Sequence, residues 1–205
     1  VKKVIYAESA ALYEKINKFP TPEDEIAPET FYGISKFCNH YFAKAYQQFY
    51  GLKTVGLRYF NVYGPRQDYR RTIPPVMSAF IIKFLKDEQP IIFGDGKRRY
   101  DFIHVDDIND FHLLCTKDSR VDNLVFNLGT GKNYSILELY EIVAKIMDSS
   151  LRAVHKPALE GGSEISIADI RRAKGLGWSP KVSLENGLRG MIEYIKAEIS
   201  KGNIK

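Results

Sequence analysis

The sequence predicts an α/β fold built on a parallel sheet, and three stretches carry that prediction. Residues 3–7 and 52–60 are apolar runs of strand length, and residues 32–50 repeat aromatic side chains at steps of three and four, as on one face of a helix. A strand, a helix and a strand of these lengths are typical of a crossover between parallel strands. The first run lacks polar alternation, as expected of a strand covered on both faces.

The remaining elements follow from local signals. A polar loop with prolines over 19–28 separates the first strand from the helix, which Gly51 ends. Further helices are expected at 76–87, 136–148 and 184–200, together with one running to about 117 and a short one at 169–175. Further strands are expected at 91–93, 100–105 and 125–128. Expected N-caps are Asp106 or Asp107, Ser135 in a capping box with Glu138, and Ser183.

Composition and charge narrow the class of protein. With 205 residues, 44% of them apolar and 27% charged, the chain can bury a proper core. The net charge of +5 is scattered along the sequence, so it supports a phosphate-bearing ligand weakly and nucleic acid poorly. No apolar run has the length of a membrane span, and the first residues resemble no signal peptide.

Cysteine and histidine positions argue against metal and disulfide chemistry. Cys38 and Cys115 lie far apart in sequence, which suits a reducing cytoplasm. The four histidines lack the spacing of metal ligands, so no metal site is expected. The chain begins directly on a strand, which suggests that an upstream part is absent.

Tyr32 and Lys36 are the first candidate functional pair. Residues four apart share one face of a helix. A tyrosine is a poor base at neutral pH, and a cation beside its oxygen lowers its pKa. On this spacing alone, an exposed lysine beside a packed tyrosine is the more ordinary interpretation.

Two further polar residues are expected near this pair. Ser9 follows the first strand and Asn61 follows the second. Because neighbouring parallel strands end at the same edge of a sheet, Ser9, Tyr32 with Lys36, and Asn61 can all face one crevice.

At this point the sequence resembles the extended short-chain dehydrogenase/reductase family, specifically its NAD-dependent sugar-nucleotide epimerases and dehydratases. The resemblance is closest to UDP-hexose 4-epimerases and covers nearly the whole chain. It is carried, in family order, by Tyr32-Gly-Ile-Ser-Lys36, Arg58-Tyr-Phe-Asn-Val-Tyr-Gly-Pro-Arg66, Gly94-Asp-Gly96, Asp101-Phe-Ile-His-Val-Asp-Asp107, Asn127-Leu-Gly-Thr-Gly131, Ala168-Asp-Ile170 and Leu176-Gly-Trp-Ser-Pro180.

The resemblance implies a fold, a cofactor and a partner. The fold would be the carboxyl-terminal part of a Rossmann-type sheet over 1–68, with a smaller mixed α/β substrate-binding lobe over 69–205 and the chain crossing back near 91–127. The cofactor would be NAD and the substrate a nucleotide-diphosphate sugar. The aromatic helix at 32–50, typical of core or of a dimer interface, is expected to serve as both and to form a homodimer.

The resemblance also implies roles around the reacting sugar. Tyr32 would be the catalytic base. Lys36 would bind the nicotinamide ribose and lower the Tyr32 pKa, and Ser9 would hydrogen-bond the reacting sugar oxygen. Phe60 and Val62 would contact the nicotinamide.

Other residues would hold the rest of the substrate. Asn61 would bind the sugar or its diphosphate, and Ile91 and Phe93 would flank the nucleotide base. Many relatives carry Arg where this chain has Tyr100, and Arg98, on the same face of an extended segment, is the expected substitute.

Two departures from the family refine the prediction. The 4,6-dehydratases carry an acid pair where this chain has Ala10 and Ala11, which leaves C4 epimerisation through a 4-keto intermediate. No Gly-x-x-Gly-x-x-Gly motif is present, so the chain alone is expected to bind NAD poorly. The alternatives are a non-catalytic sugar-nucleotide-binding or dimerising lobe, or another nucleotide-sugar epimerase or reductase.

Overall fold

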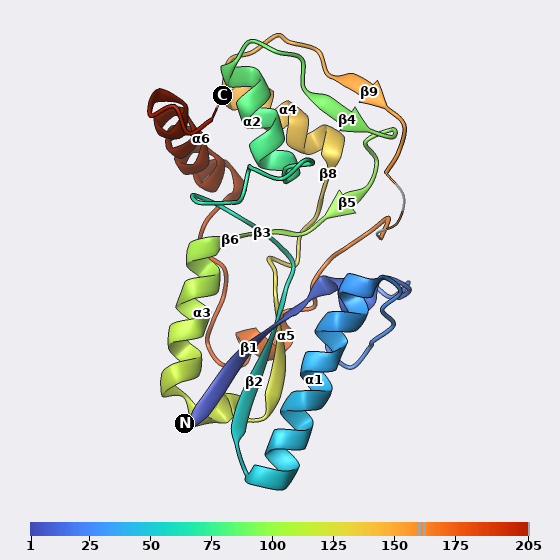
Figure 1. Cartoon of the computed structure of the whole chain (residues 1–205), viewed down its shortest axis with the longest axis vertical. Helices are drawn as coiled ribbons and strands as arrows, with labels where there is room; N and C mark the ends of the chain where they lie inside the picture. The colour runs from blue at the N-terminus through green and yellow to red at the C-terminus, as the bar shows by residue number, and fades with distance from the viewer. Residues whose placement is uncertain (160, 162, 205) are drawn as a thin grey trace.

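A parallel sheet forms one half of the molecule (Figure 1). The computed structural model describes residues 1–159, 161 and 163–204. Strand β1 (Lys3–Ser9) pairs with β2 (Lys53–Tyr59), which pairs with β7 (Leu124–Leu128), all in parallel. Helix α1 (Phe31–Tyr50) connects β1 to β2. The predicted strand–helix–strand crossover is therefore confirmed.

Local contacts fix the start and the end of α1. The Thr30 hydroxyl caps the helix by accepting a hydrogen bond from Gly33 N, and Gly51 ends it with a left-handed φ of 63°. Glu14 accepts from Thr30 N and Thr30 Oγ1, both at 2.7 Å. A side chain at Gly33 would place its Cβ 2.8 Å from Ala11 O, so only glycine allows this close approach.

The second half of the molecule is a helical lobe with short strand pairs. Helices α2 (Val76–Leu85), α4 (Ile136–Ile146) and α6 (Leu184–Ser200) form it. The short pairs are β3 (Asn61–Tyr63) with β6 (Phe102–His104), β4 (Ile91–Phe93) with β9 (Val154–Lys156), and β5 (Arg99–Tyr100) with β8 (Tyr134–Ser135). The capping box of Ser135 with Glu138 and the N-cap at Ser183 are confirmed.

Each half has its own hydrophobic cluster. The sheet core lies between the strands, helix α3 (Val105–Lys117) and the segment after α5 (Arg171–Lys174), with η2 (Ser119–Val121) at one end. It contains Val55, Leu57, Ile103, Ile108, Phe111, Cys115, Val121, Phe126, Leu128, Ala173 and Trp178. In Figure 1, α1 and α3 flank β1 and β2 on opposite sides.

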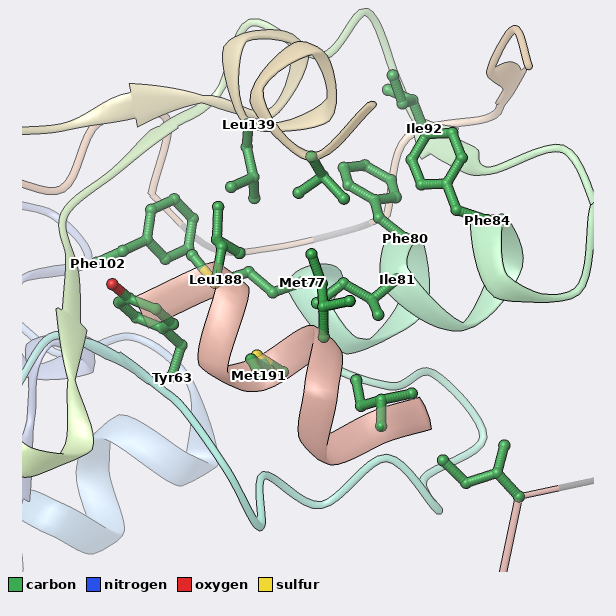
Figure 2. Close-up of a cluster of buried hydrophobic side chains, with 14 residues drawn as sticks. Tyr63, Met77, Phe80, Ile81, Phe84, Ile92, Phe102, Leu139, Leu188 and Met191 are labelled. Atoms are coloured by element: carbon green, nitrogen blue, oxygen red, sulfur yellow. The ribbon is translucent and has the colours of Figure 1, made fainter. Parts of the chain in front are cut away.

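The lobe core lies where three helices meet. Figure 2 shows Phe80 from α2, Leu139 from α4 and Met191 from α6, which belong to one buried cluster. Residues 103–128 and 173–178 contribute to the sheet core, so the chain returns to the sheet after its first visit to the lobe. The division at residue 68 stays a prediction about domains.

Three expectations about local structure were wrong. Strand β1 is the outer strand of the described sheet and is not covered on both faces, since Val4 is 37% exposed. The expected strand at 100–105 is split into β5 and β6 at Asp101, whose carboxylate is buried and accepts hydrogen bonds from the backbone of 130, 131 and 168. Helix α3 is capped by His104, whose Nδ1 accepts from Asp106 N, and not by Asp106 or Asp107.

The aromatic face of α1 is largely exposed. Gly33 and Ala43 are the buried residues of this helix, and most of its aromatic side chains face outward. The expectation that the stripe forms core was therefore wrong. Among the described residues, no helix combines the length and apolar character needed to cross a bilayer.

Candidate active site

A cavity of about 470 Å³ opens where the end of β1, the start of α1 and strand β3 come together. Five of the residues predicted for the site line it: Ser9, Tyr32, Phe60, Asn61 and Val62. Parallel pairing explains this placement, since the register of β1 and β2 sets Ser9 opposite Tyr59 at one sheet edge. The structure thus brings together side chains from three separate segments.

Each polar side chain in this cavity is held by its own element. Ser9 Oγ accepts from Ala11 N at 3.2 Å, at the start of η1 (Ala10–Tyr13). Asn61 Nδ2 donates to Asp101 O at 3.1 Å, which orients its amide. Tyr32, on the first turn of α1, is 56% exposed, so its phenol is accessible. A hydroxyl, an amide and a phenol can together bind and deprotonate an alcohol.

Lys36 lies beside Tyr32, as the shared helix face predicts. Its Nζ is 5.5 Å from the centroid of the Tyr32 ring. Lys36 is not among the residues that line the cavity. The ammonium therefore contacts the aromatic face of Tyr32.

A second cavity, of about 630 Å³, continues from the first. Asn61, Val76 and Phe102 line both cavities, so the two form one groove. The lining of the second cavity includes four more predicted site residues: Ile91, Phe93, Arg98 and Tyr100. The groove thus joins a polar end at Tyr32 to an end lined by aliphatic and aromatic side chains.

Arg98 and Arg99 point to different sides of the chain, as predicted. Arg98 lines the second cavity, where its Nε donates to Glu164 Oε1 at 3.0 Å and its Nη1 to Gly161 O at 2.9 Å. Arg99 Nε instead donates to Asn133 Oδ1 at 3.1 Å. Burial raises the pKa of Tyr100, and the neighbouring Arg98 opposes that shift.

Sequence reasoning missed a buried ionic network behind the first cavity. Glu8 is 1% exposed and accepts from Arg58 Nε at 2.5 Å, with His40 Nδ1 at 3.1 Å from its other oxygen. Arg58 also donates to Tyr13 Oη at 2.9 Å. Burial alone would raise the pKa of Glu8, but the hydrogen bond with His40 and the charge of Arg58 hold it below its ordinary value.

A signal for this network was present in the sequence. Glu8 and Arg58 are charged residues in two runs expected to be buried, and buried charges need partners. Three more polar lining residues of the first cavity were also missed: Gln67, Asp68 and Arg71. They lie in the loop after β3, which carried no motif beyond its basic composition.

The described residues fit one end of NAD. Phe60 and Val62 supply apolar walls beside the Tyr32 phenol, which suits a nicotinamide ring and its ribose. The sequence contains no Gly-x-x-Gly-x-x-Gly loop for the pyrophosphate. The fit therefore concerns the nicotinamide end alone.

Known proteins are similar to this chain in sequence and in fold. The family model for the NAD dependent epimerase/dehydratase family matches residues 1–129. A Methanocaldococcus jannaschii protein provisionally named UDP-glucose 4-epimerase is 35% identical over 198 residues, covering 96% of this chain and 64% of that protein. This chain therefore spans about two thirds of that relative's length.

Solved structures agree with the sequence comparison. The UDP-glucose 4-epimerase of Thermotoga maritima, solved with UDP-glucose, has a TM-score of 0.92 at 39% identity, covering 97% of this chain and 65% of that one. The UDP-glucuronic acid 4-epimerase of Bacillus cereus, solved with UDP-glucuronic acid and NAD, has a TM-score of 0.88 at 29% identity, covering 95% of this chain and 62% of that one. The chain belongs to the NAD dependent epimerase/dehydratase family.

Proposed function

We propose that this chain carries the substrate side of an NAD-dependent epimerase that inverts C4 of a nucleotide sugar through a 4-keto intermediate. The observation that carries the proposal is the groove, which has Ser9 and Tyr32 at one end, a mostly apolar cavity at the other, and Asn61 in the lining of both. A nucleotide sugar matches this arrangement, because it has a hydroxyl-rich sugar at one end and a flat, less polar base at the other. The similarity to UDP-sugar 4-epimerases supports the same assignment.

At the reacting end, the roles follow from what each side chain can donate or accept. Tyr32 accepts the proton of the C4 hydroxyl, and Ser9 donates a hydrogen bond to the same oxygen as it becomes a carbonyl. Lys36 holds a positive charge beside Tyr32, with its Nζ 5.5 Å from the centroid of the ring. Bound NAD supplies a hydride acceptor. When the reaction reverses on the other face of the sugar, Tyr32 returns the proton.

Epimerisation is preferred to elimination because of the residues beside Ser9. Ala10 and Ala11 begin η1 there. Elimination of water needs an additional acid and base at the neighbouring carbons. Two methyl groups supply neither, so oxidation followed by reduction at C4 is the chemistry that this end of the groove supports.

At the other end, the groove suits the nucleoside diphosphate. Ile91 and Phe93 would flank the base, and Arg98 and Tyr100, which line the same cavity, are the candidates for diphosphate contacts. The Arg98 guanidinium already contacts Glu164 at 3.0 Å. Diphosphate binding there therefore requires Arg98 to exchange or share that partner.

The proposal is tested by following UDP-glucose to UDP-galactose conversion with NAD in large excess, because the chain alone is expected to bind NAD poorly. We expect Tyr32→Phe to lower turnover by about 10²–10⁴-fold, the usual range for losing a general base. Tyr41→Phe is the matched control, since Tyr41 is an exposed tyrosine of the same helix. Unchanged turnover in Tyr32→Phe would exclude Tyr32 as the base. Binding without turnover in the wild type would favour a non-catalytic lobe.

Self-association through α1 is part of this proposal. The exposed face of the helix carries Phe42, Tyr46 and Phe49, and Phe49 is 73% exposed. Water-exposed aromatic rings on neighbouring turns favour burial against a second copy. Sedimentation equilibrium should give twice the chain mass of 23.5 kDa, and Phe49→Glu should give a monomer. Leu113→Glu, at an exposed position on α3, should leave the dimer intact.

The predicted cytoplasmic location also belongs to the proposal. Cys38 is exposed and Cys115 is buried, and both are free thiols. A reducing compartment keeps an exposed thiol in that state. Thiol titration of protein purified from cells without reductant should find both groups free.

A further inference from the structure

We propose that the sugar end of the groove selects a neutral hexose over a hexuronate, and that Asp68 determines this preference. The inference rests on the proposed function. The two sugars differ at C6, where a hexose has a hydroxymethyl group and a hexuronate has a carboxylate. The selection therefore depends on the charges that line the cavity around Tyr32.

Within the described part of the chain, three charged residues line that cavity, and two of them are acidic: Glu8, Asp68 and Arg71. The carboxylate of Glu8 is committed to Arg58 and His40 behind the cavity wall. Among the residues that the structure describes, Arg71 is thus the one cation in the lining. The Lys36 ammonium lies over the ring of Tyr32 and outside the lining.

The Asp68 carboxylate is paired with this cation, the Arg71 guanidinium. Its Oδ2 accepts from Arg71 Nε at 3.4 Å, and its Oδ1 accepts from Arg70 N at 3.2 Å. A hexuronate carboxylate could reach a counter-charge here only by competing with Asp68 for Arg71. It would also come close to the negative charge of Asp68, and like charges at short range repel each other.

A neutral hexose can contact the same residues without charge repulsion from Asp68. A hydroxymethyl group can donate its O–H to the Asp68 carboxylate, which is a strong acceptor. Ser9, Tyr32 and Asn61 can both donate and accept hydrogen bonds, which matches ring hydroxyls. The pair of Asp68 with Arg71 therefore favours the neutral sugar and disfavours the charged one.

Calorimetric titration of the chain with UDP, UDP-glucose and UDP-glucuronate tests the inference. We expect UDP-glucose to bind on the order of tenfold more tightly than UDP-glucuronate, as one unfavourable charge contact of about 1.4 kcal/mol implies. Asp68→Asn should remove most of that ratio by strengthening UDP-glucuronate binding, and it should leave UDP binding unchanged. Asp110→Asn is the matched control, because Asp110 also pairs with a cation, Lys181, but lies on α3 away from the groove.

The outcomes separate the two proposals. If the wild type binds none of the three nucleotides, the proposed function fails and this inference fails with it. If UDP binds but UDP-glucuronate binds as tightly as UDP-glucose, only the sugar preference is overturned. A wild-type preference that survives unchanged in Asp68→Asn overturns the role of Asp68. Asp68 is half exposed on a loop, so Asp68→Asn is expected to fold, and its thermal unfolding should be measured beside that of the wild type.

Discussion

Replacing Glu8 by Gln is expected to destabilise the protein strongly, although the side chain keeps its size. In the folded chain, Glu8 is ion-paired with Arg58 at 2.5 Å, and both side chains are almost fully buried. The substitution leaves a buried guanidinium without its counter-charge. The remaining partners of Arg58, Tyr13 Oη and Glu23 O, accept hydrogen bonds but carry no charge at those atoms.

The size of the effect follows from the burial of the pair. Breaking a buried ion pair from one side costs about 3–5 kcal/mol. Because the Gln carbonyl can still accept from Arg58, we expect a loss near the lower limit, about 3 kcal/mol. An exposed pair such as Glu193 with Lys196 is worth about 0–1 kcal/mol. Glu193→Gln is therefore the control, and its stability should match the wild type.

Urea unfolding followed by the fluorescence of Trp178 measures both variants. Trp178 is the one tryptophan in the sequence, and it is buried in the sheet core. The free energy of unfolding should fall by about 3 kcal/mol in Glu8→Gln at pH 7. A loss below 1 kcal/mol would refute the reasoning, since it would mean that the Arg58 charge needs no buried partner.

The same variant has a defined pH dependence. The folded-state pKa of Glu8 lies below its ordinary value, so its stabilising effect is present above the unfolded pKa of about 4.3. That effect is lost as the pH falls through the folded-state pKa. The stability difference between wild type and Glu8→Gln should therefore be present at pH 7 and shrink in buffer more acidic than the unfolded-state pKa.

Two further substitutions test close contacts elsewhere. Asp101→Ala should lower the free energy of unfolding by about 3–5 kcal/mol, and chemical denaturation measures the loss. The reason is that buried backbone donors, including those of Thr130 and Ala168, are left without an acceptor. Gly187→Ala should destabilise by about 1–2 kcal/mol, since its Cβ would lie 2.7 Å from Tyr63 Cε2 and overpacking outweighs the gain in helix propensity. Gly190→Ala on the same helix meets nothing within 4 Å and should instead raise the melting temperature.

Elements with local signals could be predicted from the sequence. The hydroxyl of Ser135 and the carboxylate of Glu138 satisfy backbone donors within one turn, so their pattern marks a helix start without knowledge of the fold. Gly51 ends α1 for an equally local reason, since its φ is positive. The convergence of Ser9 and Asn61 followed from topology, because parallel neighbours share an edge.

Features set by distant contacts could not be predicted in this way. Asp107 does not cap α3, because its carboxylate accepts from Lys181 N at 2.8 Å and Val182 N at 3.2 Å, far along the chain. The Asp101 carboxylate likewise accepts hydrogen bonds from the backbone N–H groups of Thr130 and Ala168, which lie 29 and 67 residues later in the chain. The aromatic residues of α1 show a helical repeat, but the repeat alone does not distinguish a core from an outer face.

The fate of the hydrogen at C4 tests the central claim most directly. UDP-glucose deuterated at C4 should be incubated with the protein and NAD, and the UDP-galactose formed should be examined by mass spectrometry and NMR. The account predicts that deuterium stays on C4 with inverted configuration, since the same hydride leaves C4 and returns to it without exchanging with solvent. Product that carries solvent hydrogen at C4 would contradict oxidation and reduction at this carbon.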